Sequence, residues 1–158
     1  MNICVAGTGY VGLVTGAVFA DLGNDVVCVD NVAEKIAALQ AGRMPIYEPG
    51  LEEMVARNAA DGRLSFTADL AAAVRRSVIV FITVGTPAKD TGQTDLAAVE
   101  AVARQIGLAM ERYTVVVNKS TVPVGTGELV REVIERHQPK PVPFDVVSNP
   151  EFLREGAA

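Results

Sequence analysis

Three glycines near the start of the sequence have the spacing of a phosphate-binding turn. The pattern G-x-G-x-x-G lies between an apolar run and a segment of small residues, in Gly7-Thr8-Gly9-Tyr10-Val11-Gly12. Gly7 would permit a tight turn, Gly9 would let a pyrophosphate approach the backbone, and Gly12 would allow close packing of helix on strand. Unpaired N–H groups at the start of the helix attract phosphate. The turn, with Tyr10 and Val11, is therefore predicted to bind a nucleotide.

A carboxylate, Asp30, follows the second apolar run, 18 residues beyond Gly12. At that position it accepts hydrogen bonds from ribose hydroxyls and repels a 2′-phosphate, and Asn31 rather than an arginine follows it. The pair therefore favours NAD over NADP. Asp30 could instead only cap the helix expected from Ala33, and Lys35 is either a second ribose contact or a solvated lysine. S-adenosylmethionine enzymes and flavoproteins share glycine-rich first turns, but the combination of turn, helix and Asp30 favours a nicotinamide dinucleotide.

These residues require strands and helices in a particular order. Short apolar runs alternate with longer helical segments throughout the 158 residues. The expected strands are 3–6, 26–29, 64–67, 78–84, 114–118 and 144–147. The expected helices are 12–22, 33–40, 51–60, 69–76, 96–110 and 128–137. This alternation predicts an α/β fold: one Rossmann-type domain over residues 1–158, with a doubly wound parallel sheet of about six strands and helices on both faces.

Composition and charge exclude several classes of function. Hydrophobic residues make up 49% and charged residues 21% of the sequence, as in a globular protein. The net charge of −5 argues against a nucleic-acid partner. The apolar run 78–84 is too short to cross a membrane and no leader pattern precedes the first strand, so a cytoplasmic location is expected. Cys4 and Cys28 lie in strand-like runs and are expected in the core, and no metal site is expected.

Four further stretches, each after or between expected elements, carry a family resemblance. They are residues 45–51 (PIYEPGL), 84–87 (VGTP), 119–126 (KSTVPVGT) and 149–156 (NPEFLREG). With the Gly-Tyr-Val-Gly form of the turn, they resemble the N-terminal NAD-binding domain of the UDP-glucose/GDP-mannose dehydrogenase family, across essentially the whole sequence. Most of them would lie at the carboxyl ends of strands, where open parallel sheets bind ligands.

The resemblance implies a two-step, four-electron oxidation. Two NAD molecules in turn accept hydride as the C6 alcohol of a UDP-sugar becomes an aldehyde and then a carboxylate. A cysteine captures the aldehyde as a thiohemiacetal, and water hydrolyses the thioester that follows. Thr121 would lie near the nicotinamide and this water, and Glu151 would be its general base or hold it in place.

Further roles follow from the same resemblance. The expected cofactor contacts, besides the turn, are Asp30, Lys35, Gly85, Thr86, Pro87, Ser120, Thr121 and Glu155. The expected contacts to the sugar nucleotide are Glu151, Phe152, Leu153, Arg154 and Glu155. A plainer interpretation is that Thr86 and Thr121 belong to ordinary turns whose hydroxyls bond local backbone. Glu151 and Glu155 could likewise be solvated charges.

The sequence departs from the family in one respect. The nucleophilic cysteine of the family, with an assisting lysine and aspartate, lies far downstream, and so do a central helix and a second, UDP-sugar-binding domain. We therefore expect a truncated or excised domain that binds NAD without turnover, from a parent that the family implies is a homodimer.

Three alternatives remain at this point. The motifs favour UDP-glucose as the parent's substrate over GDP-mannose or UDP-N-acetylmannosamine. A stand-alone NAD-binding module without catalysis would have no use for Thr121 and Glu151. A β-hydroxyacid-type dehydrogenase would need a downstream lysine or histidine base, and the single histidine, His137, is expected on the surface at a helix end.

Overall fold

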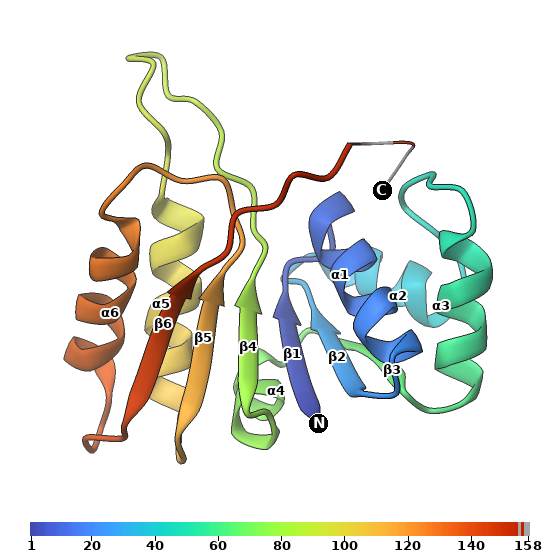
Figure 1. Cartoon of the computed structure of the whole chain (residues 1–158), viewed down its shortest axis with the longest axis horizontal. Helices are drawn as coiled ribbons and strands as arrows, with labels where there is room; N and C mark the ends of the chain where they lie inside the picture. Colours follow the sequence, from blue (N-terminus) through green and yellow to red (C-terminus); the bar gives the residue numbers. More distant parts are fainter. Residues whose placement is uncertain (155, 157–158) are drawn as a thin grey trace.

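The structure, a computed structural model, describes residues 1–154 and 156, and within these residues six strands and six helices alternate (Figure 1). The strands are β1 (Asn2–Ala6), β2 (Asp25–Val29), β3 (Leu64–Thr67), β4 (Ile79–Ile82), β5 (Thr114–Asn118) and β6 (Phe144–Ser148). The helices are α1 (Tyr10–Asp21), α2 (Ala33–Gln40), α3 (Leu51–Ala60), α4 (Leu70–Arg76), α5 (Ala97–Ala109) and α6 (Thr126–His137). All strand pairs are parallel, in the order β3-β2-β1-β4-β5-β6. The predicted doubly wound Rossmann fold is confirmed.

The strand order determines which face each helix covers. From β1 the chain moves outward through β2 to β3, returns to β4 beside β1, and then moves outward the other way. Because such crossovers are right-handed, α1 and α3 pack on one face of the sheet and α4, α5 and α6 on the other (Figure 1), and the apolar side chains of α2 join the core cluster under α1 and α3. The direction reverses between β1 and β4, and this leaves a crevice at their carboxyl ends.

The apolar strands make the core on both faces. Ile3, Cys4 and Val5 of β1 are 0% exposed, with Cys4 in the cluster under α4–α6 and its neighbours in the cluster under α1–α3. Cys28 of β2 is equally buried, which confirms that both cysteines belong to the core. Burial raises the pKa of the Cys4 thiol to about 12 and also raises the pKa of the Cys28 thiol.

The expected element bounds differ from the structure by a few residues. β4 ends at Ile82 rather than at residue 84, and the hydroxyl of the following Thr83 donates toward the carbonyl oxygens of Ala6 and Gly7, at 2.9 and 3.1 Å. Helix α6 begins at Thr126 instead of residue 128, directly after Gly125, which has a left-handed φ of 91°. Helix α1 likewise begins at Tyr10 instead of residue 12, and the remaining differences are of one residue.

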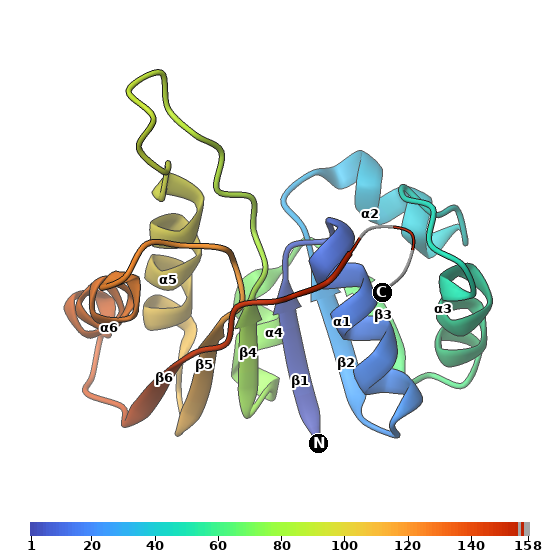
Figure 2. The same cartoon turned by 45° about the horizontal axis from the view of Figure 1, so that its top comes forward.

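Two irregular segments extend over the carboxyl edge of the sheet. Residues 149–154 leave β6 and cross above the ends of β5, β4 and β1 toward the start of α1, as Figure 2 shows. Residues 85–96 form an arm with one antiparallel bridge, between Ala88 and Thr94. Among the helices of the described chain, none is long and apolar enough to span a bilayer.

Candidate functional site

Two neighbouring hollows lie at the carboxyl edge of the sheet. The larger has a volume of about 480 Å³ and the smaller about 220 Å³, and both are lined by Gly9, Thr83, Val84 and Gly85. The larger extends toward β2 and α5, whereas the smaller extends toward the loops after β5 and β6. The loop after β4 therefore separates two compartments of one site.

The glycine-rich turn is held too tightly for larger residues at two positions. Gly7 has a φ of 116°, and a Cβ there would lie 2.5 Å from the Thr83 carbonyl oxygen. A Cβ at Gly12 would lie 1.9 Å from the Gly7 carbonyl oxygen. Gly7 therefore makes a tight turn, and Gly12 brings the helix close to that turn and to Thr83 directly after β4, where close packing of helix on strand was predicted.

Gly9 differs because it faces open space. A Cβ built at Gly9 would meet nothing within 4 Å among the described atoms. Gly9 is also the N-cap of α1; it supplies no side-chain cap, and the first turn of α1 contains no acidic residue. The first amides of the helix thus face the hollow with their partial positive charge. The space and the dipole at this position fit a bound pyrophosphate.

Asp30 lies opposite the turn, with a carboxylate oriented by backbone and side-chain donors. Its Oδ2 accepts hydrogen bonds from the Thr8 hydroxyl at 2.6 Å and the Thr8 N–H at 3.0 Å, and its Oδ1 accepts the Val32 N–H at 3.0 Å. The Lys35 ammonium lies 3.5 Å from Oδ2. Asp30 is not the cap of α2, because the N-cap of that helix is Val32.

The electrostatics of Asp30 suit a site for ribose hydroxyls. Burial alone would raise the pKa of this carboxyl, but the hydrogen bonds from Thr8 and Val32 and the charge of Lys35 outweigh it, so the pKa is lowered. The group is therefore ionised at neutral pH and accepts hydrogen bonds only. A second negative charge, such as a 2′-phosphate, would be repelled there.

The remainder of the larger hollow is a slot of mostly small and apolar side chains between the sheet and α5. Its lining includes Ala68, Leu70, Ala98, Ala101, Val102 and Gln105. A slot of this kind suits the flat face of a base, next to the carboxylate that would bind its ribose. The amides at the open turn, the Asp30 carboxylate and the apolar slot together fit an adenine dinucleotide.

The smaller hollow contains the predicted catalytic pair. The Thr121 hydroxyl donates a hydrogen bond to Oε1 of Glu151 at 3.0 Å, which brings together loops that follow β5 and β6. Both residues line the hollow, next to Tyr10 and Val11. Glu151 Oε2 is buried and has no hydrogen-bond partner in the described part of the chain. A carboxylate oxygen in that condition can accept a proton or bind a water molecule.

Hydroxyl groups tie the site loops together. Thr86 donates to the carbonyl oxygen of Thr121 at 2.8 Å, and Ser120 donates to the carbonyl oxygen of Val84 at 2.8 Å. The plainer interpretation, that the Thr86 hydroxyl bonds local backbone, does not hold, since its acceptor lies in a different loop. The Ser120 hydroxyl proton is used within the protein, although its oxygen can still accept a hydrogen bond.

Several predicted site residues lie outside both hollows. The carbonyl oxygen of Pro87 accepts the Asp95 N–H at 2.8 Å and stabilises the arm. Phe152 is 96% exposed, and Leu153 and Arg154 are exposed beside it. Glu155 lies outside the described residues.

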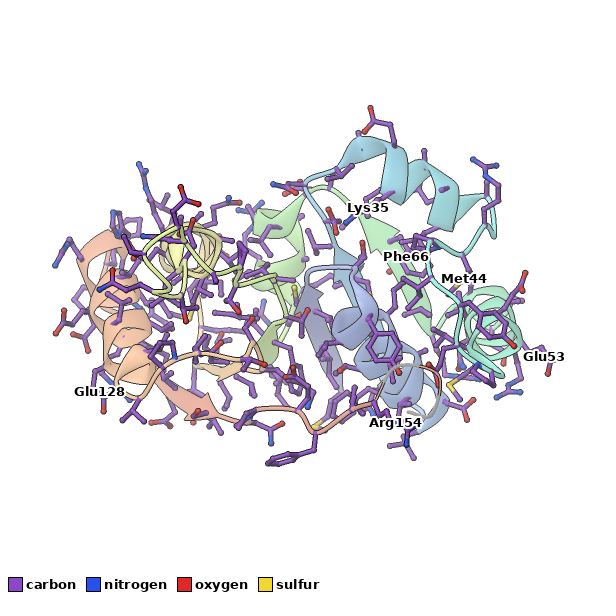
Figure 3. All side chains as sticks on the ribbon, turned by 90° about the horizontal axis from the view of Figure 1, so that it is seen from above. Lys35, Met44, Glu53, Phe66, Glu128 and Arg154 are labelled. Atoms are coloured by element: carbon purple, nitrogen blue, oxygen red, sulfur yellow. The ribbon has the colours of Figure 1, made fainter. Side chains whose placement is uncertain are left out.

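Seen from the carboxyl edge, Lys35, which lines the larger hollow, and Arg154 lie on opposite sides of the start of α1 (Figure 3).

Three residues of the site were not predicted from the sequence to have roles in it. Thr8 orients Asp30, Thr83 fixes the turn, and Glu48 accepts a hydrogen bond from the Tyr10 hydroxyl at 2.8 Å. Thr8 occupies a variable position of the glycine pattern, and Thr83 follows an apolar run. The one available signal was for Glu48, a charged residue within the family-like stretch 45–51.

A further hollow, of about 660 Å³, lies between α6 and the first residue of β6. It is at the amino end of that strand, away from the edge where parallel sheets bind ligands.

In the described chain, no three His, Cys, Asp or Glu side chains gather as a metal site would require. His137 ends α6, where its Nδ1 lies 2.8 Å from the Val133 carbonyl oxygen.

Comparison with known proteins agrees with this geometry. Residues 1–158 match the NAD binding domain of the UDP-glucose/GDP-mannose dehydrogenase family. The chain is 54% identical to UDP-glucose 6-dehydrogenase TuaD of Bacillus subtilis over 157 residues, which are 99% of this chain and 34% of that protein.

Solved structures show the same similarity. A UDP-glucose dehydrogenase from Pyrobaculum islandicum superposes with a TM-score of 0.94 at 48% identity, over 99% of this chain and 37% of that one. A GDP-mannose dehydrogenase from Pseudomonas aeruginosa, solved as a ternary complex, also gives 0.94, at 43% identity over the same shares of the two chains. The chain thus spans about a third of the length of the relatives that it matches.

Proposed function

Because the chain belongs to the UDP-glucose/GDP-mannose dehydrogenase family and forms its NAD-binding domain, we propose that it is the cofactor-binding part of a UDP-glucose 6-dehydrogenase. The observation that carries this proposal is the open turn at Gly9 facing the ionised carboxylate of Asp30, with the Thr121–Glu151 pair in the adjoining hollow. A dinucleotide that joined these features would have its pyrophosphate at the turn and its nicotinamide end toward Glu151.

Residues of both hollows would hold the cofactor. The amides of Tyr10 and Val11 would bind the pyrophosphate, and Asp30 with Lys35 would bind the adenosine ribose. When bound, NAD would supply the hydride acceptor for the oxidation of a sugar alcohol. Gly85, Thr86 and Ser120 would border the same path, since they line one or both hollows.

Thr121 and Glu151 would act on water rather than on the cofactor. The hydrogen bond from Thr121 fixes Oε1 of the Glu151 carboxylate. The other oxygen, Oε2, is buried and has no hydrogen-bond partner among the described residues. Oε2 would accept a proton from a water molecule that attacks an acyl intermediate, which is general base catalysis. Replacing Glu151 by Gln in the whole dehydrogenase should lower turnover about 10²–10⁴-fold.

The chain by itself should bind NAD but not complete the oxidation. Its two cysteines are 0% exposed, and burial raises the pKa of both thiols, so neither can serve as the thiolate nucleophile that the reaction of the family needs. Incubation of the chain with UDP-glucose and NAD⁺ should yield no UDP-glucuronate. Steady formation of that product would refute the proposal.

Titration calorimetry tests the binding half of the proposal. NAD⁺ should bind the chain more tightly than NADP⁺, because Asp30 repels the 2′-phosphate of NADP⁺. Asp30→Ala should lower the affinity for NAD⁺ and reduce the preference, while Asp61→Ala, at an exposed aspartate beyond α3, should bind NAD⁺ as the wild type does. Absence of NAD⁺ binding by the wild-type chain would contradict the assignment.

The substrate of the whole protein is proposed from similarity. Identity is 54% to a UDP-glucose 6-dehydrogenase and 43% to a GDP-mannose dehydrogenase, which favours UDP-glucose. An assay of the whole dehydrogenase with UDP-glucose, GDP-mannose and UDP-N-acetylmannosamine decides among them. Turnover of GDP-mannose alone would favour the second candidate.

A further inference from the structure

The carboxylate of Glu48 lies where three separate segments of the chain meet. Glu48 belongs to the loop between α2 and α3, and its side chain is only 8% exposed. Its Oε2 accepts hydrogen bonds from the Tyr10 hydroxyl at 2.8 Å and from the Gly156 N–H at 2.7 Å. Tyr10 is the first residue of α1, and Gly156 lies beyond Glu151 on the segment that follows β6. One buried carboxylate thus joins the glycine-rich turn to the segment that carries the candidate base.

Hydrogen bonds, more than burial, determine the path of that segment. Residues 149–154 form neither helix nor strand. The Asn149 N–H donates to the Asn118 carbonyl oxygen at 3.0 Å where the segment begins, and the Tyr10 hydroxyl lies 2.9 Å from the Arg154 carbonyl oxygen near its end. Phe152 between them is 96% exposed. A segment with so little apolar burial moves readily when its hydrogen bonds are lost.

The geometry points to Glu48 as a positioning residue: we propose that it latches residues 149–154 and Gly156 onto the start of α1 and thereby keeps the Glu151 carboxylate against Thr121. The contact between Glu151 and Thr121, at 3.0 Å, lies between the two ends of the segment. Glu48 itself is absent from the lining of both hollows within the described chain, so it acts through the segment and not on substrate. This inference rests on the proposed function, because Glu151 needs a fixed position only if it acts on water.

A carboxylate suits this task better than a neutral side chain. A carboxylate accepts hydrogen bonds without donating, so one oxygen can receive both the Tyr10 O–H and the Gly156 N–H. Hydrogen bonds to an ionised acceptor are roughly twice as strong as neutral ones, and partial burial strengthens them further. Glutamine retains an acceptor oxygen and should preserve part of the latch, whereas alanine should abolish it.

The first test measures motion of the segment in this chain by ¹⁵N relaxation. In the wild type, residues 151–154 should have order parameters near those of rigid backbone, about 0.85, and in Glu48→Ala they should fall below about 0.6. Glu48→Gln should lie between the two. Glu53→Ala is the matched control, because Glu53 is an exposed acid on α3 that points outward, away from Arg154 (Figure 3). If Glu48→Ala does not fold, Glu48→Gln carries the same measurement, with order parameters of residues 151–154 expected below those of the wild type.

The second test is kinetic and uses the whole dehydrogenase. Glu48→Ala should lower kcat about 10- to 100-fold, because a displacement of about 1 Å at a reacting group has that effect. KM for NAD⁺ should stay within about threefold, Glu48→Gln should recover most of the loss, and Glu53→Ala should match the wild type. A merely structural role would change stability and both kinetic constants together.

The two proposals fail in different ways. If the wild-type chain does not bind NAD⁺, the proposed function fails, and the order parameters still report whether Glu48 holds the segment. If NAD⁺ binds but residues 151–154 stay rigid in Glu48→Ala, or kcat is unchanged, the latch is refuted while the proposed function stands.

Discussion

Gly9→Ala separates cofactor binding from folding, because Gly9 is the one glycine of the turn that faces open space. Its φ of −74° and ψ of −171° are allowed for alanine. A Cβ would meet nothing within 4 Å in the described structure, in contrast to the contacts of 2.5 Å at Gly7 and 1.9 Å at Gly12. The free energy of unfolding should therefore change by less than about 1 kcal/mol, a balance of reduced chain entropy and a poorer N-cap.

The effect on binding should be much larger. The methyl group would occupy the space in which a pyrophosphate must approach the amides of α1. A hydrogen bond from a backbone N–H to a charged group contributes about 1.5–3 kcal/mol. Loss of one such bond corresponds to about 10- to 100-fold weaker binding, since each 1.4 kcal/mol is a factor of ten.

Calorimetry with NAD⁺ measures the affinity, and thermal melting without ligand measures the fold. Gly127→Ala is the matched control: Gly127 lies in the first turn of α6, its Cβ would also meet open space, and it lines neither hollow in the described chain. If Gly9→Ala binds NAD⁺ as tightly as the wild type, the pyrophosphate does not rest on this turn. If it fails to fold, the space at Gly9 is not open.

Three further outcomes follow from the same structure. Gly12→Ala should destabilise the fold by about 1–3 kcal/mol, because its Cβ would lie 1.9 Å from the Gly7 carbonyl oxygen; an unchanged denaturation midpoint would contradict that packing. The lowered pKa of Asp30 means that its ionised form stabilises the fold fully above the ordinary value of about 3.9, and that this contribution is lost as pH falls through the lower folded-state pKa. Unfolding of the wild type and Asp30→Asn should therefore differ at neutral pH and converge in acid. Cys4 and Cys28 should react with a thiol reagent only after unfolding, because burial raises the pKa of both; rapid reaction of the native chain would show that they are accessible.

The fold could be predicted from the sequence because its signals are local. The bounds of α2, α3, β3 and β5 match the predicted ones residue for residue. The continuous apolar runs of a sheet buried on both faces identified the strands. The two-residue errors fell at the start of α1, at the end of β4 and at the start of α6, where the glycine-rich turn, Thr83 and the left-handed Gly125 lie; the remaining bounds differ by one residue. Periodicity contains no information about any of these three.

The candidate site was predictable only in part, because sequence patterns report on local structure and not on contacts between distant residues. Gly7, Gly9, Gly12 and Asp30 belong to one short pattern whose geometry is fixed by a single strand-turn-helix unit. The structure adds the reason why Asp30 is oriented and ionised. The carboxylate accepts two hydrogen bonds from Thr8 and one from the Val32 N–H, and the Lys35 ammonium lies beside it. A threonine at a variable position of the pattern gives no sign of that partner.

The remaining contacts of the site join residues from different loops, and this explains both why sequence patterns miss them and why the site should be sensitive. Thr86 with Thr121, Thr121 with Glu151, and Glu48 with Gly156 each meet through one hydrogen bond across the carboxyl edge. No loop among them is regular enough to hold its own position. The sheet determines where each loop begins. The position of the side chains on each loop depends instead on hydrogen bonds from single hydroxyl and carboxylate groups. Loss of one such group should therefore displace Thr121 and Glu151, the candidate catalytic pair, while the sheet beneath them remains folded.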